Sequence, residues 1–543
     1  MKTRSGKRKL DEGTSSSREE HSKEEGDEFE VDDEEDDEGM GYERIWADDD
    51  SNTYVETPMP SNATDEDFFW YDRTHKWTDD RPPPSYPKER RDPTLTGKFF
   101  CYKFPFAALN RRFATQTSTR PVNELIDETL NSFSNGIYDF NHFEAGIRIY
   151  YKNFNAACLK ALAASMGEAQ ILDLISKIAI LARRSHEVIT GPLPFLTRKA
   201  PFRTVSMTQE QAAVLLAYAF FCTLDHTSNN FPHFSFDRIH KGKSVMYLEK
   251  MKFILAYFTS VTESMPTGTL TFKRQSWKGT ATDNKFDSWE KETKPLSDFI
   301  VLKDGRIEDM DGLLQVDFAN RFLGGGVLGQ GCVQEEIRFL CYPELMVSMI
   351  LCSVLDDTEA IVIQGAQRYS EYTGYASSTR WKPVYEDETK RDVFGRRRCY
   401  VVAIDALCFS EGTKYTQFSL TNVRRELNKA MAGYLLSTPT SPVRPIATGN
   451  WGCGAFNGNK ELKAMIQLLA ASYSGRPVYY LTYENASDYE QKGLGEKLKQ
   501  IYRLLKMNNV TIGMLYSILI NVNQRQRGHT VIQYIASELS SRH

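Results

Sequence analysis

The sequence predicts an α/β protein in which helices cover both faces of a sheet, preceded by an all-helical domain and a disordered acidic tail. Three observations support this prediction. Hydrophobic residues make up 41% and aromatic residues 12% of the 543-residue chain, enough for a large core. Helical periodicity dominates residues 96–265, whereas short β-rich runs alternate with amphipathic helices in residues 266–543. Residues 1–95 are rich in acidic residues and proline and sustain no apolar period.

The segment 1–95 is predicted to be a disordered tail with a basic start. Residues 1–10 carry five Lys or Arg and no acid, whereas residues 11–50 carry twenty acids and three bases. Because the whole chain has a net charge of −5, residues 51–543 sum to +7. A basic body favours a polyanionic partner, although ordinary solubilising charge explains +7 equally well. The cluster at residues 4–10 (RSGKRKL) is of the kind that nuclear import receptors read.

Several classes of protein are disfavoured. The longest unbroken apolar run, residues 212–222, is far shorter than the ~18 to 20 residues that span a bilayer. Nine cysteines form no CxxC pair and nine histidines form no HExxH motif. We therefore expect no membrane span, no metal site and no disulfide framework.

Residues 96–265 are predicted to form a helical domain with no chemistry of its own. Thr208 and Gln211 have the spacing of a capping box ahead of an apolar helix that ends near Cys222. Two further helices are indicated by apolar residues three and four positions apart, namely Ile171, Leu174, Ile175 and Ile178, and Leu248, Met251, Leu255 and Phe258.

Residues 266–543 are predicted to form the α/β domain. In such sheets ligands bind beyond the carboxyl ends of the strands, so the loops after those strands are candidate sites. The expected strands are 270–273, 313–318, 360–363, 400–404, 443–447 and 478–483, and the expected helices are 343–355, with Pro343 in its first turn, 423–435 and 462–469.

Acidic residues border a glycine-rich loop after the strand expected at 313–318. The triple glycine at 324–326 lets the backbone approach a ligand, and its N–H groups suit an anion such as a diphosphate. Glu335 and Glu336 face one ligand only from a turn or a helix start, where they alternatively just complement the helix dipole. Asp317 favours the functional alternative, because three carboxylates beside an anion cradle suit acid/base work on a glycosidic bond.

A second glycine-rich loop, residues 448–456, follows the run expected at 443–447 and offers further backbone donors. Tyr375 and Tyr483 are candidate platforms for a base or a ribose, although aromatic side chains more often belong to a core.

Together these motifs resemble the signature of the poly(ADP-ribose) glycohydrolase family. The resemblance rests on residues 316–322 (VDFANRF), on the triple glycine, and on the motif 334–336 (QEE), which follows after seven residues. It continues through residues 338–340, 369–375, 425–429 and 447–456, and upstream through 207–211 and 266–268, so that it covers about residues 100–540.

The resemblance implies a macrodomain-like mixed sheet packed on the helical domain, and an enzyme that hydrolyses the ribose-to-ribose bonds of poly(ADP-ribose) without metal or cofactor. It implies that Glu336 acts as general acid toward the departing ribose and then as base toward water. Glu335 would hold ribose hydroxyls, and Asp317 would help to set the carboxylates.

The resemblance also implies a set of substrate-binding residues. Among them, Ile307 and Glu308 match an adenine-contacting pair, and Tyr483 stands where the family often has phenylalanine, so that its added hydroxyl needs a partner. The full set is Ile307, Glu308, Asn320, Gly324, Gly325, Gly326, Gln334, Tyr375, Asn450, Trp451, Gly452, Cys453, Gly454, Ala455, Phe456 and Tyr483.

The implied partners are poly(ADP-ribose) and poly(ADP-ribosyl)ated proteins. We expect a monomer that binds neither DNA nor membranes. We expect it in the nucleus, with a share in the cytoplasm, and in the DNA damage response. The rival interpretation is a macrodomain that binds ADP-ribose without cleaving it, which would need the glycine loops but not the acidic pair. A nucleic-acid-binding scaffold has little beyond the charge of +7 in its favour.

Overall fold

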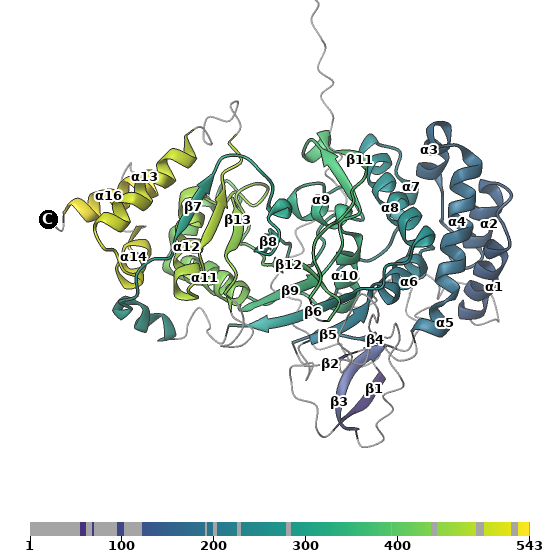
Figure 1. The fold of residues 1–543 in the computed structure, drawn as a ribbon, viewed down its shortest axis with the longest axis horizontal. Helices are drawn as coiled ribbons and strands as arrows, with labels where there is room; N and C mark the ends of the chain where they lie inside the picture. The colour runs from purple at the N-terminus through teal and green to yellow at the C-terminus, as the bar shows by residue number, and fades with distance from the viewer. Residues whose placement is uncertain are drawn as a thin grey trace, which may run out of the picture. The chain divides into compact units, whose positions relative to one another are not determined.

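A nine-stranded mixed sheet forms the centre of the computed structural model (Figure 1). The model describes residues 55–60, 68–69, 95–102, 122–189, 193–198, 204–224, 230–277, 284–392, 394–435, 443–484, 493–522 and 530–541. In their order across the sheet, the strands are β2 (Phe68–Phe69), β5 (Thr204–Thr208), β6 (Thr269–Ser276), β9 (Glu359–Gly365), β12 (Arg397–Ala403), β8 (Leu314–Asp317), β13 (Ile446–Gly449), β14 (Val478–Leu481) and β7 (Phe299–Leu302).

Five neighbouring strands run in parallel, and this brings their carboxyl ends to one edge. The parallel pairs are β12 with β8, β8 with β13, β13 with β14, and β14 with β7. Strand β9 pairs antiparallel with both β12 and β6, and β6 pairs antiparallel with β5. The loops after β7, β8, β13 and β14, which carry the candidate site residues, therefore lie at the same edge.

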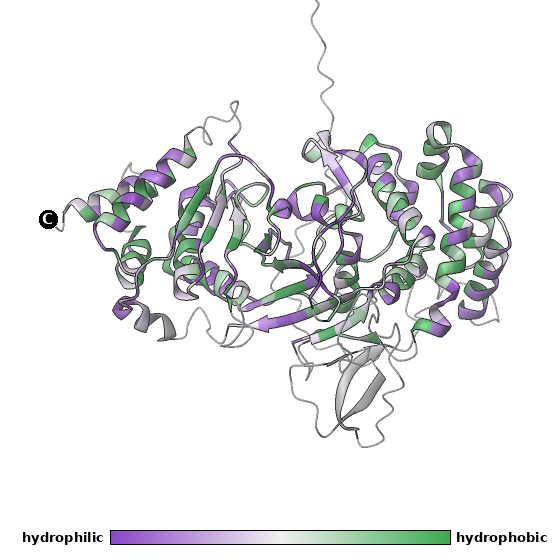
Figure 2. Ribbon diagram, viewed as in Figure 1, coloured by the Kyte–Doolittle hydropathy of each residue, from purple (hydrophilic) through white to green (hydrophobic). Residues whose placement is uncertain are grey.

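Both faces of the sheet are buried, as predicted from the nearly continuous apolar strands. Alternate residues of β9 enter two separate cores: Ile361 and Ile363 join one core, whereas Ala360 and Val362 join the other. Helices of the amino-terminal half pack in the first core and carboxyl-terminal helices in the second. Figure 2 shows hydrophobic and hydrophilic stretches along these helices, as expected when one side of each helix is buried.

The predicted helical region is confirmed over most of its length. The capping box is present: the Gln211 N–H donates to the Thr208 side chain and the Thr208 N–H donates to the Gln211 side chain, each at 3.0 Å. The helices are α1 (Val122–Ser134), α2 (Phe140–Arg148), α3 (Ala157–Met166), α4 (Glu168–Arg183), α5 (Ser185–Val188), α6 (Gln209–Phe220), α7 (Asp237–Lys241) and α8 (Val245–Glu263).

The region 96–265 is not all-helical, which corrects the prediction. Strand β5 lies inside it and pairs with β6 along five residues, so the helical region contributes directly to the central sheet. The signal was missed because the five residues of β5 run without a break into the capping box of α6. A smaller sheet, β1-β3-β4, contains β1 (Val55–Pro60), β3 (Leu95–Tyr102) and β4 (Leu193–Pro194).

The predicted tail, residues 1–95, falls mostly outside the described residues, including the basic cluster and the acidic run. Within it, β1 and β2 are strands, so the prediction of a continuous disordered segment does not hold at those two places. Among the described helices, none is long and apolar enough to cross a membrane. The described residues also contain no group of three His, Cys, Asp or Glu side chains placed to hold a metal ion.

The helix expected at 343–355 is shorter than predicted. It starts with Pro343 as a 3₁₀ turn and ends at Leu351, and the following N–H groups of Val354 and Leu355 bond to Asn230 and Arg321 instead of continuing the helix. Of the other two expected helices, the one predicted at 423–435 spans 420–434, and the one predicted at 462–469 extends at both ends to 460–473. The helices of this region are α9 (Gln334–Cys341), α10 (Val347–Leu351), α11 (Leu420–Tyr434), α12 (Lys460–Tyr473), α13 (Leu494–Met507), α14 (Ile512–Ile520) and α16 (Val531–Ser540).

Candidate active site

The three predicted acids meet at the carboxyl edge of the sheet. Asp317 is the last residue of β8, and Glu335 and Glu336 lie in the first turn of α9. The acidic pair is therefore at a helix start, as the sequence required. Their side chains are nearly inaccessible, with exposed fractions of 1%, 3% and 6% in sequence order. Burial of three carboxyl groups is costly unless hydrogen bonds or proton uptake offset it.

Backbone N–H groups of the loop after β8 hold the acidic pair. Glu335 accepts from the N–H of Asn320 at 2.8 Å and of Gly324 at 2.6 Å. Glu336 accepts from the N–H of Gly326 at 2.9 Å and, through its other oxygen, from that of Val333 at 2.8 Å. Each carboxyl oxygen thus has its own backbone donor, and the loop fixes both side chains.

This arrangement explains the middle glycine of the triple. A Cβ on Gly325 would lie 2.4 Å from Oε1 of Glu336 and 2.8 Å from Oε2 of Glu335, and its φ of +48° is in the left-handed region. Any side chain there would collide with both carboxyl groups.

Asp317 differs from the acidic pair because, among the described residues, neither of its carboxyl oxygens has a hydrogen-bond partner. Burial, against the opposing charge of Arg338 and with the added repulsion of Glu336, raises the pKa of Asp317 to about 8. Burial, together with the charges of Asp317 and Glu336, also raises the pKa of Glu335 well above its ordinary value. The site therefore retains protons near neutral pH, since adjacent carboxyl groups cannot all ionise.

The expectation that the triple glycine offers its N–H groups to a diphosphate is not what the structure shows. Gly324 and Gly326 donate to the acidic pair, and Gly325 donates to Phe322 O at 3.2 Å. Gln334 is likewise engaged within the protein, where its side chain accepts from the Phe318 N–H at 2.8 Å and donates to Val316 O at 3.2 Å. These residues bind the end of β8 to the start of α9.

The second glycine-rich loop retains free donors. Within the described part of the chain, the N–H groups of Gly452, Gly454 and Ala455 have no acceptor. Asn450 anchors the loop by donating to Thr482 O at 2.8 Å and accepting from the Tyr480 hydroxyl at 3.1 Å. The anion cradle expected from the sequence is therefore available here rather than at the triple glycine.

Not every residue of the second loop faces outward. Trp451 is fully buried and donates from its indole nitrogen to Ile404 O at 2.9 Å, so its side chain supports the loop from beneath. Any contribution of Trp451 to substrate binding would therefore come from its backbone, as part of the loop expected to cradle the diphosphate. Phe456 is partly buried against the second core, and Cys453 is also only partly exposed.

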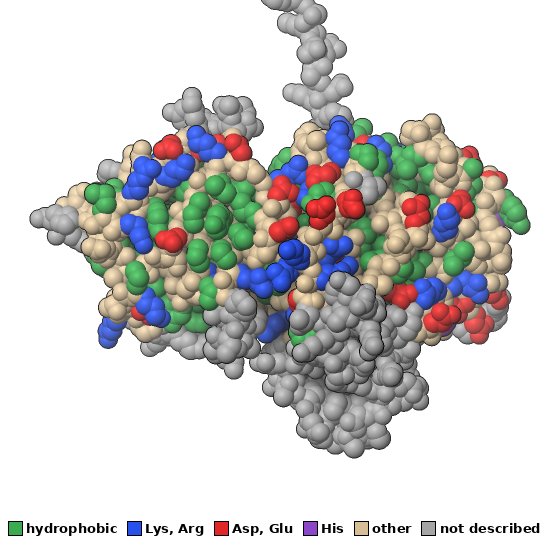
Figure 3. All heavy atoms as spheres, in the orientation of Figure 1, with side chains coloured by type: hydrophobic (Ala, Val, Ile, Leu, Met, Phe, Trp, Pro, Cys, Tyr) green, Lys and Arg blue, Asp and Glu red, His purple; other side chains and the backbone are tan. Residues whose placement is uncertain are grey.

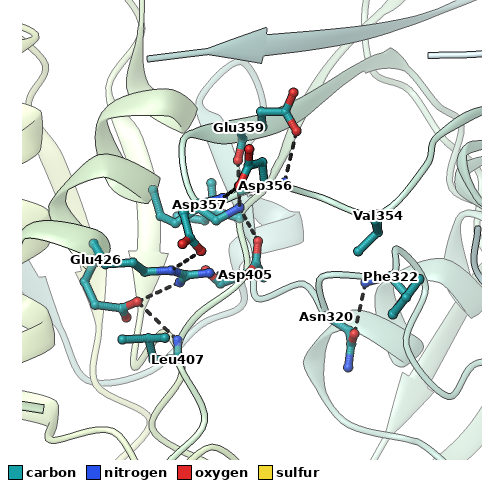
Figure 4. Close-up of polar contacts among 12 residues, drawn as sticks. Asn320, Phe322, Val354, Asp356, Asp357, Glu359, Asp405, Leu407 and Glu426 are labelled. Carbon is teal, nitrogen blue, oxygen red and sulfur yellow. Dashed lines mark hydrogen bonds and ion pairs between the residues drawn. The ribbon is translucent and has the colours of Figure 1, made fainter. Parts of the chain in front are cut away.

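A cluster of ion pairs, buried except at Asp357, lies at the end of β12 beside this loop. Figure 4 shows Asp357, Asp405 and Glu426 converging, with Leu407 next to Glu426. Arg425 joins the three acids, with distances of 3.0 Å to Asp357, 2.5 Å to Asp405 and 2.7 Å to Glu426. Glu426 also accepts from the Leu407 N–H at 3.1 Å.

Two lysines complete the cluster. Lys429 pairs with Asp405, and Lys463 pairs with Glu426. The Lys463 ammonium also lies 4.0 Å from the centre of the Trp451 ring, directly linking the cluster to the second loop. The sequence motif 425–429 contributed to the resemblance, but its spacing alone indicated no role for it, because only the fold brings it next to residues from β12 and α12.

The aromatic residues lie on the exposed side of the site. Tyr375 and Tyr483 have exposed fractions of 54% and 37%. Burial, with further contributions from Glu308 and Tyr375 and against an opposing effect of the Ile307 backbone, raises the pKa of the Tyr483 hydroxyl. Glu308 accepts from the Tyr372 hydroxyl at 2.7 Å, a partner that sequence reasoning missed.

Asn320 is held in a tight turn, with its side-chain oxygen accepting from the Phe322 N–H at 3.0 Å (Figure 4).

Charge on the visible face is mixed: Figure 3 shows Lys and Arg side chains near the middle of the view, next to a group of acidic ones. The net positive charge of residues 51–543 therefore does not form one uniform basic face in this view.

Two family descriptions match the chain. The description "Poly (ADP-ribose) glycohydrolase (PARG), Macro domain fold" matches residues 286–490, and the description of the PARG helical domain matches residues 168–274.

Individual relatives agree with these matches. Poly(ADP-ribose) glycohydrolase 1 of Caenorhabditis elegans is 34% identical over 394 residues, which cover 70% of this chain but only 47% of the relative. Poly(ADP-ribose) glycohydrolase 2 of the same organism is 32% identical over 420 residues, covering 73% of this chain and 82% of the relative. Poly(ADP-ribose) glycohydrolase 1 of Arabidopsis thaliana is 33% identical over 396 residues, which cover 59% of this chain and 70% of the relative.

The packing at Gly325 predicts a specific loss of stability. Gly325→Ala should lower the free energy of unfolding by about 2 to 4 kcal/mol, because the added methyl meets both carboxyl groups and the backbone is left-handed. Gly329→Ala, in the same loop, is the control, since its Cβ would approach nothing closer than 3.7 Å. Denaturant unfolding measures both variants, and equal stability of the two would contradict this packing.

The raised pKa of Asp317 predicts a pH-dependent gain in stability on its replacement. Folding favours the protonated form, so the free energy of unfolding falls as pH rises from about 4 toward about 8. Asp317→Asn removes this loss. The change that it causes in the free energy of unfolding should therefore be more stabilising at pH 8 than at pH 5 by at least about 1 kcal/mol, since one pKa unit corresponds to about 1.4 kcal/mol. Denaturant unfolding at both pH values tests this.

Asp173→Asn serves as the control for this comparison, because Asp173 is a 64% exposed side chain paired with Lys177. Its effect should differ little between the two pH values. An Asp317→Asn effect that is the same at pH 5 and pH 8 would show that Asp317 titrates in the ordinary range.

Proposed function

The chain belongs to the poly(ADP-ribose) glycohydrolase family, and we propose that it hydrolyses the ribose-to-ribose bonds of poly(ADP-ribose) and releases ADP-ribose. The observation that carries this proposal is the pair Glu335 and Glu336, held by four backbone N–H groups at the edge of the sheet. A protein that only binds ADP-ribose needs an anion cradle but has no need of this costly acidic pair.

The proposed reaction uses Glu336 twice. Its carboxyl group donates a proton to the oxygen of the departing ribose as the glycosidic bond breaks, and positive charge develops on the remaining ribose. The resulting carboxylate then accepts a proton from water, whose oxygen forms the new bond to that ribose. One water is consumed, and Glu336 returns to its starting protonation state.

The two other acids assist without needing to change charge. Because burial raises the pKa of Asp317 to about 8, this group favours its protonated form near neutral pH, and the raised pKa of Glu335 shifts that group in the same direction. A protonated Glu335 can donate to a ribose oxygen as well as accept, and neither group adds a negative charge beside Glu336. This division supports Glu336 as the acid that exchanges protons during turnover.

The substrate diphosphate is proposed to bind the second glycine-rich loop, whose N–H groups at Gly452, Gly454 and Ala455 lack acceptors among the described residues. Tyr375 and Tyr483 then lie near the base and ribose, while Ile307 and Glu308 face the adenine. The parallel strand order supports this placement, since it brings the loops after β7, β8, β13 and β14 together.

Incubation of the full chain with labelled poly(ADP-ribose) in the presence of a metal chelator tests the activity. The expected result is shortening of the polymer with release of ADP-ribose. Intact polymer together with saturable ADP-ribose binding would instead support a non-catalytic reader.

Substitution of Glu336 separates chemistry from binding. Glu336→Gln keeps the size of the side chain but removes the exchangeable proton, so kcat should fall by roughly 10² to 10⁴ while ADP-ribose affinity changes little. Steady-state kinetics and calorimetric binding measure the two quantities.

Glu168→Gln is the matched control, because Glu168 is an exposed acid in the first turn of α4 and can only complement the helix dipole. It should retain wild-type kcat. If Glu336→Gln also turned over at nearly the wild-type rate, Glu336 would have no more than that electrostatic role.

We further propose that the protein acts as a monomer on poly(ADP-ribosyl)ated proteins during the DNA damage response, mainly in the nucleus with a cytoplasmic share. The basic cluster at residues 4–10 supports the nuclear assignment. Replacing Lys7, Arg8 and Lys9 with alanine in a fluorescent fusion should abolish nuclear accumulation. Unchanged nuclear accumulation would exclude this cluster as the import signal.

A further inference from the structure

A lysine of the helical region reaches the loop that holds the acidic pair. Lys250 lies on α8, is only 1% exposed, and donates from Nζ to the carbonyl oxygens of Gly326 at 3.0 Å, Val327 at 3.1 Å and Gly329 at 2.6 Å. A fourth bond joins the same ammonium to Gly331 O. Helices α8 and α9 lie side by side, with α9 next to β8 (Figure 1).

The ammonium has an unusual environment for a buried charge. None of the ion pairs among the described residues includes Lys250, and its hydrogen bonds go to peptide carbonyls instead. Burial lowers its pKa to about 8, against the opposing effects of Cys332 and Glu336. An apolar residue would fill the same volume at lower electrostatic cost, so simple packing does not explain a lysine here.

The peptide groups of the loop point in two directions. Their carbonyl oxygens converge on Lys250, whereas the N–H groups of Gly324, Gly326 and Val333 converge on the acidic pair. Gly326 takes part in both sets, because its N–H donates to Glu336 at 2.9 Å and its oxygen accepts from Lys250 at 3.0 Å. A shift of this loop therefore necessarily disturbs a donor to Glu336.

We propose that Lys250 is a positioning residue for the glycosidic reaction, which fixes the loop 324–333 and through it the carboxyl group of Glu336. The inference rests on the proposed function. It gives the helical region a direct part in turnover without substrate contact. Lys250 acts on the orientation of the acid, whereas the anion cradle at 450–456 is built on other elements and does not depend on it.

Lys250→Met tests this proposal, since methionine is of similar length but donates no hydrogen bond. We expect kcat to fall about 10- to 100-fold, because a displacement of about 1 Å at a reacting group can cost 10²-fold. The dissociation constant for ADP-ribose should stay within about twofold of wild type. Hydrogen exchange of peptides covering residues 320–336 should become at least about tenfold faster, because the loop loses its anchor.

Lys250→Gln provides a second variant that retains two N–H donors and should give intermediate kcat and exchange. It decides the question alone if Lys250→Met does not fold. Lys252→Met is the control on the same helix, because Lys252 pairs with Glu249 at 2.5 Å instead of with the loop, and it should match wild type in kcat and in hydrogen exchange of residues 320–336.

Three outcomes would overturn the proposal. The first is wild-type kcat in the folded Lys250 variants, and the second is unchanged exchange in residues 320–336. The third is an equal loss of kcat and ADP-ribose affinity with lower thermal stability, which would make Lys250 a general structural residue. Hydrogen exchange needs no turnover, so an inactive wild-type protein would refute the proposed function while the loop measurement still decides whether Lys250 holds the loop.

Discussion

Burial of three carboxyl groups at one edge of the sheet is the constraint on which the rest of the site depends. Asp317, Glu335 and Glu336 are within electrostatic range of one another and almost without solvent. The protein offsets the cost in two ways, with backbone N–H donors to the acidic pair and with raised pKa values of Asp317 and Glu335, which favour the uncharged forms of these groups. The tight loop, the glycine at 325 and the start of α9 all follow from the need to supply those donors.

The two glycine-rich loops have opposite uses despite similar composition. In the first, N–H groups bond within the protein to the carboxyl groups of Glu335 and Glu336 and so orient them. In the second, the N–H groups of Gly452, Gly454 and Ala455 have no acceptors among the described residues, while Lys463 links Trp451 to the ion pairs around Arg425. A loop that must keep donors free for a ligand needs rigidity from elsewhere, and the buried ion pairs supply it.

Much of the site could be predicted from the sequence because its chemistry is local. Asp317 ends a strand, and Glu335 and Glu336 start a helix, so their positions along the sequence brought them together as candidates. The direction of peptide groups is not local, and the use of the triple glycine was therefore misjudged. The burial of the Trp451 side chain is likewise not local, since it depends on packing against residues of other elements. Lys250 lies 76 residues before Gly326, and no periodicity in α8 distinguishes it from any other lysine.

The pairing of β5 with β6 has a consequence for how this architecture can be divided. Strand β6 is eight residues long and lies between β5 and β9, and the first core continues from the helices across the same strands. Cutting the chain near residue 266 would leave the backbone of β6 unpaired along one side and expose the apolar surface beneath it. Such a fragment would have an unpaired strand edge that could pair with other copies of itself and cause aggregation. The two regions thus share one sheet and one core, and neither has a boundary at residue 266 that would make it an independent module.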